Sequence, residues 1–274
     1  MAFKDILVCL DSHPSTESRI RIAVDLALRF EAHVTGLRII PLLDLPGYYT
    51  PEAMQLAVEM RRREAERYRS GPGAGFEEAL RRNGVSGELR VVEAEVDREA
   101  ALNARYADLV VLGQPDPDRP SEAAPRPDAV VLQSGRPGLV VPYIGAPDTL
   151  AERVLVAWNA GREAARAVND ALPLMRGAKV VRVVSINAER TGAPRAAPGA
   201  AIGLHLARHG INAEVSAVNT DIDPADMLLS IASDFGAHLV VMGAYGHSRA
   251  REMVLGGFTR HMLEHMTVPV FMSH

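Results

Sequence analysis

An internal duplication constrains the fold of this 274-residue chain more than any other feature of its sequence. Two stretches, DILVCLDSHPSTESRIRIAVDLAL from Asp5 and RVLVAWNAGREAARAVNDALPLM from Arg153, share one pattern. Each has a short Val/Leu/Ile run, a polar turn, and then apolar residues at helical spacing, which indicates a strand followed by a helix. Asp11 and Asn159 stand at the same place in the two copies, where the predicted strand ends.

The later parts of the two copies also correspond. ADLVVLGQ from Ala107 matches AHLVVMGA from Ala237, and GRPGLVVPY from Gly135 matches MTVPVFMS from Met266. These apolar runs are continuous rather than alternating, which is typical of strands buried on both faces of a parallel sheet. Helical segments separate them, so each half is predicted as β-α-β-α-β-α-β-α-β in an α/β, Rossmann-like, doubly wound fold. We place the boundary in the Pro/Gly-containing turn, giving domains 1–147 and 148–274.

Composition narrows the classes of partner. Hydrophobic residues make up 47% of the chain, charged residues 23%, and the net charge is −4, so neither a nucleic-acid surface nor an acidic tail is expected. The one cysteine, Cys9, cannot form an internal disulfide, which fits a reducing compartment. The first apolar run is too short for a signal peptide, and no stretch is long enough to span a bilayer. We expect a cytoplasmic protein with no membrane or nucleic-acid partner.

The basic run at Arg61 to Arg63 is interleaved with glutamates and predicts a solvated helix face over residues 52–71.

The segment MGAYGHSRAREMVLGGFTRH, from Met242 to His261, carries four glycines. The preceding run HLVVMG ends where the glycines begin, and ligands of doubly wound sheets bind beyond the carboxyl ends of the strands. Gly243 and Gly246 remove side chains where the backbone turns and approaches something closely. Gly256 and Gly257 precede a predicted helix, whose free N–H groups and dipole favour an anion. The cationic side chains between these glycines would add positive charge: Arg249, Arg251 and His247. Phosphate binding and a set of tight turns are the two interpretations.

The pattern G-x2-G-x9-G, after a buried strand and before a helix followed by TVPVFM, closely resembles that of the universal stress protein family. The openings ILVCLD and VLVAWN, each followed by an alanine-rich helix, resemble it too, and the likeness covers nearly the whole chain as two tandem copies. It implies a five-stranded parallel sheet in each copy, with the copies packed as an internal pseudo-dimer. Family members that keep the glycine pattern commonly bind ATP. By this resemblance the triphosphate lies on the four glycines, and the adenine and ribose lie near the ends of the first and second strands. The candidate binding residues are Asn159, Ser185, Met242, Gly243, Gly246, Arg249, Gly256 and Gly257.

Two departures from the family pattern affect this site. Gly257 stands where the family usually has Ser or Thr, so a hydroxyl donor is lost while the backbone N–H remains. Asn159 stands where the family usually has Asp, and an amide still hydrogen-bonds a base or ribose edge.

The first copy lacks the glycine pattern. After Gly113 comes QPDPDRPSEAAPRPDAVV, with Asp116 at the place of Gly246, and with Pro125 and Arg126 roughly at those of Gly256 and Gly257. Aspartate repels phosphate, and proline lacks an N–H donor. We therefore predict a nucleotide in the second half only. The first half would serve as a packing partner or hold a different ligand.

Three other groupings resemble reactive sites. HMLEH, from His261 to His265, matches the H-x-x-E-H zinc signature, but only nine residues follow it, and a helix surface with histidines near the C-terminus is the favoured interpretation. The aspartates in TDIDPADML are read as a helix start at Asp223-Pro224. Asp11, Ser12 and His13 include three catalytic residue types, yet sequence neighbours do not define a triad. Ser12 or Ser15 is predicted to cap the first helix instead.

The leading expectation is a stress or regulatory protein that binds ATP or another adenine nucleotide, with or without Mg²⁺, in its second half. One alternative is a scaffold or a module for a non-nucleotide ligand, in which the glycines only shape the loop. Another is a slow ATPase, although no well-placed general base or metal-binding carboxylate is evident beside the loop. We predict no catalytic or metal residues and at most weak hydrolysis. The expected assembly is the intramolecular pair of domains, with a homodimer left open.

Overall fold

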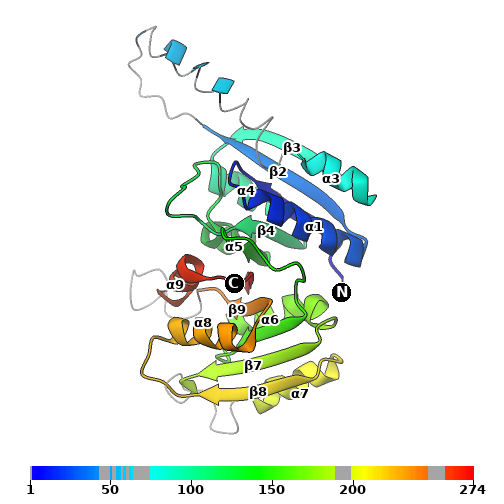
Figure 1. The fold of residues 1–274 in the computed structure, drawn as a ribbon, viewed down its shortest axis with the longest axis vertical. Coiled ribbons are helices and arrows are strands. Elements are labelled where there is room, and N and C mark those ends of the chain that lie inside the picture. The colour runs from blue at the N-terminus through cyan, green and yellow to red at the C-terminus, as the bar shows by residue number, and fades with distance from the viewer. Residues whose placement is uncertain are drawn as a thin grey trace.

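The computed structural model describes residues 2–42, 50, 54–56, 58–59, 62–63, 75–188, 199–245 and 257–274. Within this part of the chain one ten-stranded sheet runs through the whole molecule (Figure 1). The first half contributes β1 (Asp5–Leu10), β2 (His33–Pro41), β3 (Gly87–Ala94), β4 (Leu109–Gly113) and β5 (Gly138–Val141). The second half contributes β6 (Arg153–Ala157), β7 (Val180–Ile186), β8 (Ala213–Val218), β9 (Leu239–Gly243) and β10 (Val270–Ser273).

The strand order is symmetric about the centre of the sheet. It runs β3-β2-β1-β4-β5-β10-β9-β6-β7-β8, and neighbours within each half are parallel. The halves meet at an antiparallel pairing of β5 with β10, in which Val140 lies opposite Val270. Because both central strands hydrogen-bond across the joint, neither half leaves an unpaired edge there.

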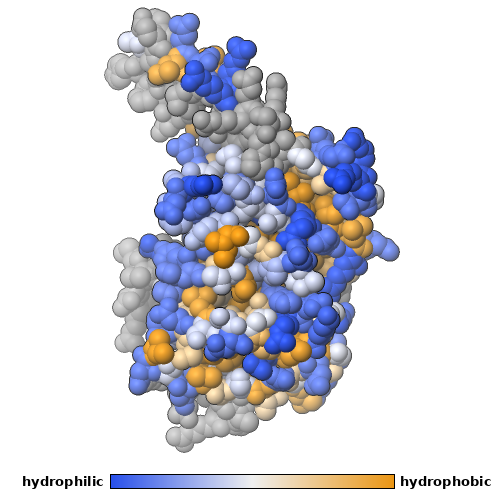
Figure 2. All heavy atoms as spheres, viewed as in Figure 1, coloured by the Kyte–Doolittle hydropathy of each residue, from blue (hydrophilic) through white to orange (hydrophobic). Residues whose placement is uncertain are grey.

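Helices cover both faces of the sheet, as continuous apolar strands require. One core packs under α1 (Thr16–Phe30), α3 (Phe76–Asn83), α6 (Arg162–Met175) and α7 (Ala200–Arg208). The other packs under α4 (Val96–Ala104), α5 (Pro127–Ser134), α8 (Pro224–Phe235) and α9 (Gly257–His265). Alternate residues of β1 enter opposite cores: Ile6 and Val8 on one side, Leu7 and Cys9 on the other. Figure 2 shows polar and apolar residues interspersed on the outer surface.

The predicted alternation of strands and helices is confirmed in both halves. The continuous runs in β4 and β9 are buried strands, whereas the outermost strands β3 and β8 expose many of their residues. Most of the charged helix predicted over 52–71 lies outside the described residues, although Arg63 and Glu59 form an i,i+4 ion pair of 3.2 Å. No helix in the described ranges is both long and apolar enough to cross a membrane. The boundary predicted at residue 147 falls between β5 and β6, and its position stays a prediction.

Helix starts match the sequence in one case and not in another. The Asp223 carboxylate accepts the Ala225 N–H and Pro224 is the first residue of α8, so the predicted cap is confirmed. Ser15 occupies the corresponding position before α1, but its hydroxyl makes no capping hydrogen bond. The prediction that Ser12 or Ser15 caps this helix is therefore wrong, because Ser12 is exposed and the Ser15 hydroxyl contacts His13.

Candidate functional site

Three of the predicted positions lie along one edge of the sheet. β9 ends at Gly243, Asn159 follows β6 by two residues, and Ser185 is the next-to-last residue of β7. These strands are parallel neighbours in the order β9-β6-β7, so their carboxyl ends meet at the same edge. Ligands of doubly wound sheets bind at this edge. Met242 is adjacent, but its side chain is buried in the core, so only its backbone can face a ligand.

The described ends of the glycine segment touch each other. The Tyr245 backbone N–H donates to the Thr259 hydroxyl over 3.1 Å, which joins the segment after β9 to the first turn of α9. Gly257 is the first residue of α9, rather than preceding it as predicted. A Cβ on Gly257 would meet nothing within 4 Å. Gly246, Arg249 and Gly256 belong to residues 246–256 and lie outside the described residues.

Gly243 is required by packing inside the protein. A Cβ built on it would lie 2.6 Å from both the Ala164 nitrogen and the Glu163 carbonyl carbon, distances that no real side chain tolerates. The first turn of α6 thus approaches the end of β9 closely enough to exclude any side chain. The prediction of close approach at Gly243 is confirmed, and its partner in the described structure is a helix of the same half.

Asn159 shapes the turn that leads into α6. Its Oδ1 accepts the Gly161 N–H over 2.9 Å, and Ala160 between them takes a left-handed φ of 59°. Asn159 is exposed, so its amide is accessible at the edge, whereas Ser185 is buried.

Glu163 is a buried acid at this edge that the sequence reasoning missed. It lies in the first turn of α6, is 7% exposed, and pairs with the Arg162 guanidinium. Burial by itself raises the pKa of Glu163, but hydrogen bonds from Arg162 and from its own backbone N–H outweigh that effect, and the pKa is lowered. Its only sequence signal was an acid in a first helical turn, which is common on any helix.

At the matching edge of the first half, Asp11 is the centre of a cluster of hydrogen-bonded protein side chains. Asp11 accepts hydrogen bonds from the His13 N–H at 2.8 Å, the Thr16 hydroxyl at 2.8 Å and Arg19 Nη2 at 2.6 Å. A Cβ on Gly113 would lie 2.9 Å from Arg19 Nη1, so the guanidinium occupies the space beside the end of β4. Arg126 directly precedes α5, and it pairs with Asp97 at 2.7 Å.

The two histidines of the H-x-x-E-H match contact other protein groups. His261 and His265 stack at 4.2 Å on one face of α9, while His261 Nε2 contacts Asp226 at 2.7 Å. The His265 ring contacts the His261 carbonyl through Nδ1. Among the residues that the structure describes, no three His, Cys, Asp or Glu side chains converge on a point that could hold an ion.

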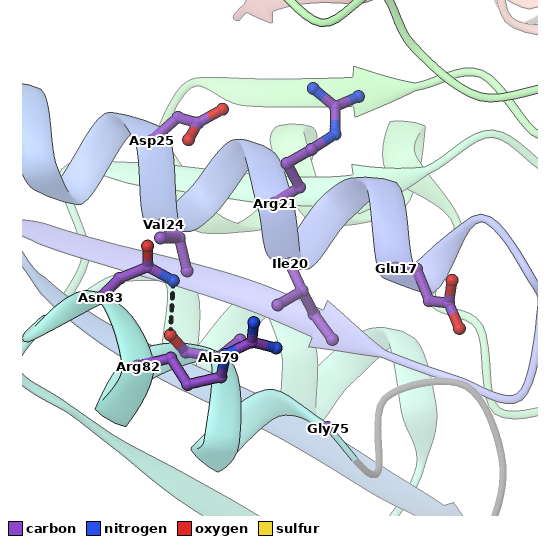
Figure 3. A pocket seen from close by; sticks show the side chains of 9 residues that line it. All are labelled: Glu17, Ile20, Arg21, Val24, Asp25, Gly75, Ala79, Arg82 and Asn83. Carbon is purple, nitrogen blue, oxygen red and sulfur yellow. Dashed lines mark hydrogen bonds between the residues drawn. The ribbon is translucent and has the colours of Figure 1, made fainter.

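One cavity lies elsewhere, between α1 and α3, with a volume of about 490 Å³. Figure 3 shows Ile20 and Val24 pointing from α1 toward α3, while Arg21 and Asp25 point away from it. The Asn83 amide donates to the Ala79 carbonyl within α3. The lining of this cavity combines a small apolar floor with charges of both signs. The cavity is separate from the strand ends of the second half.

These features define a tandem two-domain α/β protein whose halves are duplicated doubly wound units, with a candidate ligand edge in the second half. The chain belongs to the universal stress protein family, because the model of that family matches residues 2–139 and again residues 151–274.

Solved structures agree with this assignment. A universal stress protein from Archaeoglobus fulgidus DSM 4304 is 16% identical and superposes with a TM-score of 0.73, over 98% of this chain and 95% of that one. A functionally unknown protein from Pseudomonas aeruginosa PAO1 is also 16% identical, with a TM-score of 0.60 over 99% and 92% of the two chains. At these identities the likeness shows the fold.

A further similar structure is the universal stress protein from Archaeoglobus fulgidus in complex with dAMP, at 19% identity over 51% of this chain and 98% of that one. Its TM-score of 0.33 is too low for its ligand to be assigned to this chain. No curated protein matches the chain significantly.

Proposed function

We propose that the second half binds ATP or another adenine nucleotide at the carboxyl ends of β9, β6 and β7, and that the protein is a cytoplasmic stress-response regulator. The observation that carries the proposal is the position of Gly257. It is the first residue of a nine-residue helix whose opening turn contacts the segment after β9 through Thr259 and Tyr245. Backbone N–H groups at such a helix start attract phosphate.

The neighbouring strand ends supply groups for the rest of a nucleotide. The side-chain oxygen of Asn159 accepts the Gly161 N–H, so the side-chain N–H₂ of Asn159 remains as a donor toward a base or ribose. Ser185 adds a hydroxyl on the next strand. Mg²⁺, when it accompanies the nucleotide, would be held mainly by phosphate oxygens and water, because the described residues offer no cluster of acidic or histidine ligands.

The first half is proposed to bind no nucleotide. Arg19, Asp11 and Thr16 occupy the place beside the ends of β1 and β4 that corresponds to the place of Asn159 in the second half. Calorimetry with ATP and Mg²⁺ should therefore give one site per chain. Two equivalent sites, or none at millimolar nucleotide, would contradict the proposal.

Gly257→Asp separates binding from folding. A carboxylate in the first turn favours α9 by about 0.3–1 kcal/mol through the helix dipole, yet it repels a phosphate at the same place. We expect nucleotide affinity to fall at least about tenfold with no loss in the free energy of unfolding. Gly257→Ala is the matched control, because a Cβ there meets no neighbour and adds no charge. Gly257→Ser restores the hydroxyl that the family pattern has and should strengthen binding.

A scaffold or non-nucleotide module is the second candidate, and the packing of Gly243 against α6 favours it. On that interpretation, position 243 must be glycine because Glu163 and Ala164 pack closely against it, and no ligand is needed to explain it. Mass spectrometry of small molecules released from gently purified protein decides between the two candidates. Recovery of an adenine nucleotide supports our proposal. If no nucleotide is recovered and Gly257→Asp leaves the affinity for added nucleotide unchanged, the scaffold is supported.

A further inference from the structure

Three side chains of the first half form a hydrogen-bonded chain that is independent of the nucleotide proposal. The Ser15 hydroxyl lies 2.8 Å from His13 Nδ1, and His13 Nε2 lies 3.0 Å from Asp116 Oδ2. Ser15 and His13 belong to the turn between β1 and α1, while Asp116 follows β4 by three residues. The link therefore connects two loops that are 103 residues apart in the sequence.

The contacts fix the direction of each hydrogen bond. An ionised carboxylate only accepts, so Nε2 of His13 carries the hydrogen that Asp116 receives. Nδ1 then holds a single lone pair, which the Ser15 hydroxyl at 2.8 Å and the Ser15 backbone N–H at 3.1 Å share. Burial alone raises the pKa of Asp116, but hydrogen bonds from the Asp118 N–H and from His13 outweigh it, and the pKa is lowered. Hydroxyl, imidazole base and carboxylate thus stand in the order that activates a serine.

The location suits a reactive site. β1 and β4 are parallel neighbours, so the triad lies at the carboxyl edge of the sheet where doubly wound folds bind ligands. The nearby buried charge of Asp11 is balanced by Arg19. Ser15 directly precedes the fifteen-residue helix α1, whose dipole favours negative charge near its start. The Thr16 and Glu17 N–H groups already donate to the His13 and Pro14 carbonyls, so any stabilisation of an oxyanion comes from the dipole rather than from these groups.

Exposure and charge limit the substrate. Ser15 is 5% exposed, and the side chains of His13 and Asp116 are 12% and 10% exposed, so only a small group can reach the hydroxyl. Asp116 is itself an acid, and the exposed charged residues that neighbour the triad in the sequence are two acids, Glu17 and Asp118, and one base, Arg119, so the net charge disfavours an anion. A short, uncharged carboxylic ester fits both limits.

We propose that Ser15, His13 and Asp116 form an esterase site for short, uncharged esters. Ser15 Oγ bonds to the carbonyl carbon as its proton passes to His13 Nδ1, and the C–O bond to the leaving alcohol breaks as that alcohol takes the proton. Water then attacks the acyl-serine with His13 as base, which releases the acid and restores the hydroxyl. Asp116 is a positioning residue, which holds the imidazole in the active tautomer.

The test uses the full-length chain with a fluorophosphonate probe and p-nitrophenyl acetate. We expect the probe to modify Ser15, as mapped by peptide mass spectrometry, with loss of fluoride as Oγ bonds to phosphorus. Ser15→Ala abolishes labelling and ester turnover. Ser12→Ala is the matched control, because it removes an exposed hydroxyl of the same turn, and it should leave both unchanged.

Asp116→Asn distinguishes catalysis from a merely structural bridge. We expect kcat for the ester to fall about 100-fold with little change in KM, while circular dichroism shows the fold retained. If these side chains only bridge the two loops, Asp116→Asn lowers the melting temperature. In that case the wild type shows only background labelling by the probe. Absence of Ser15 labelling in the wild type, or equal turnover by Ser15→Ala, would overturn the proposal.

Discussion

Arg19 Nη2 lies 2.6 Å from Asp11 Oδ1, and both side chains are buried, at 1% and 2% exposure. Arg19 also donates to the Cys9 carbonyl and the Thr16 hydroxyl, while its Nε–H has no partner among the described residues. The pair marks where the two halves diverge. The repeat places Asn159 at the position of Asp11 and Glu163 at that of Arg19, so the second half has no ion pair between these positions.

Arg19→Met should destabilise the protein by about 3–5 kcal/mol, because it leaves the Asp11 carboxylate buried without its countercharge. Urea unfolding followed by circular dichroism measures the loss as a lower midpoint. The double variant Asp11→Asn with Arg19→Met is the control. An amide keeps the acceptor for the His13 N–H, as Asn159 does for Gly161, so most of the stability should return. A double variant as unstable as the single one would show that the packing of Arg19 matters more than its charge.

Acid should remove the contribution of Asp11. Burial raises the pKa of this carboxyl, but the charge of Arg19 and the hydrogen bonds from Arg19, His13 and Thr16 outweigh it, so the folded-state pKa is lowered. A lowered pKa adds stability above the unfolded value of about 3.9, and this stability is lost as pH falls below that value toward the folded pKa. Wild-type unfolding free energy should therefore drop more steeply below about pH 4 than that of Asp11→Asn. Parallel pH profiles would contradict the assignment.

The strand pattern and the duplication could be predicted from the sequence because strands buried on both faces consist of consecutive apolar residues. Val110, Val111 and Leu112 read as an uninterrupted apolar run, and such a run forms only where helices cover both sides. The start of α8 was equally local, since an Asp-Pro pair is sufficient to cap it.

The polar contacts across loops could not be predicted in the same way. Asp116 contacts His13 because β1 and β4 are adjacent in the sheet. The residues around each of the two side chains contain no signal that would pair them. The close neighbour of Gly243 is likewise set by how far the first turn of α6 advances over β9, a packing detail with no sequence signature. Glu163 was missed for a related reason, because its burial depends on that approach.

Gln114→Leu should weaken the joint between the halves. The amide nitrogen donates to the Leu263 and Glu264 carbonyls at the end of α9, at 2.9 and 3.2 Å, and the amide oxygen accepts the Tyr143 N–H at 3.1 Å. Leucine has a similar size but leaves these groups without the amide, so we expect a loss of about 1–3 kcal/mol in unfolding free energy. Gln133→Leu, at an exposed position of α5, is the matched control and should change stability little. Equal effects from the two variants would mean that the Gln114 bridge adds nothing.

Cys9 should react with thiol reagents only when β1 opens. The side chain is 1% exposed, and burial raises its pKa to about 12, an effect that the nearby Arg19 only partly offsets. At pH 8 the thiolate fraction is then on the order of 10³-fold below that of an unfolded cysteine with a pKa of about 8.5. Labelling with Ellman's reagent should therefore be at least that much slower in buffer than in urea, and the chain has one cysteine, so the whole signal belongs to this site. Arg19→Met should speed labelling by making opening easier, and fast labelling of the folded wild type would contradict the buried position of β1.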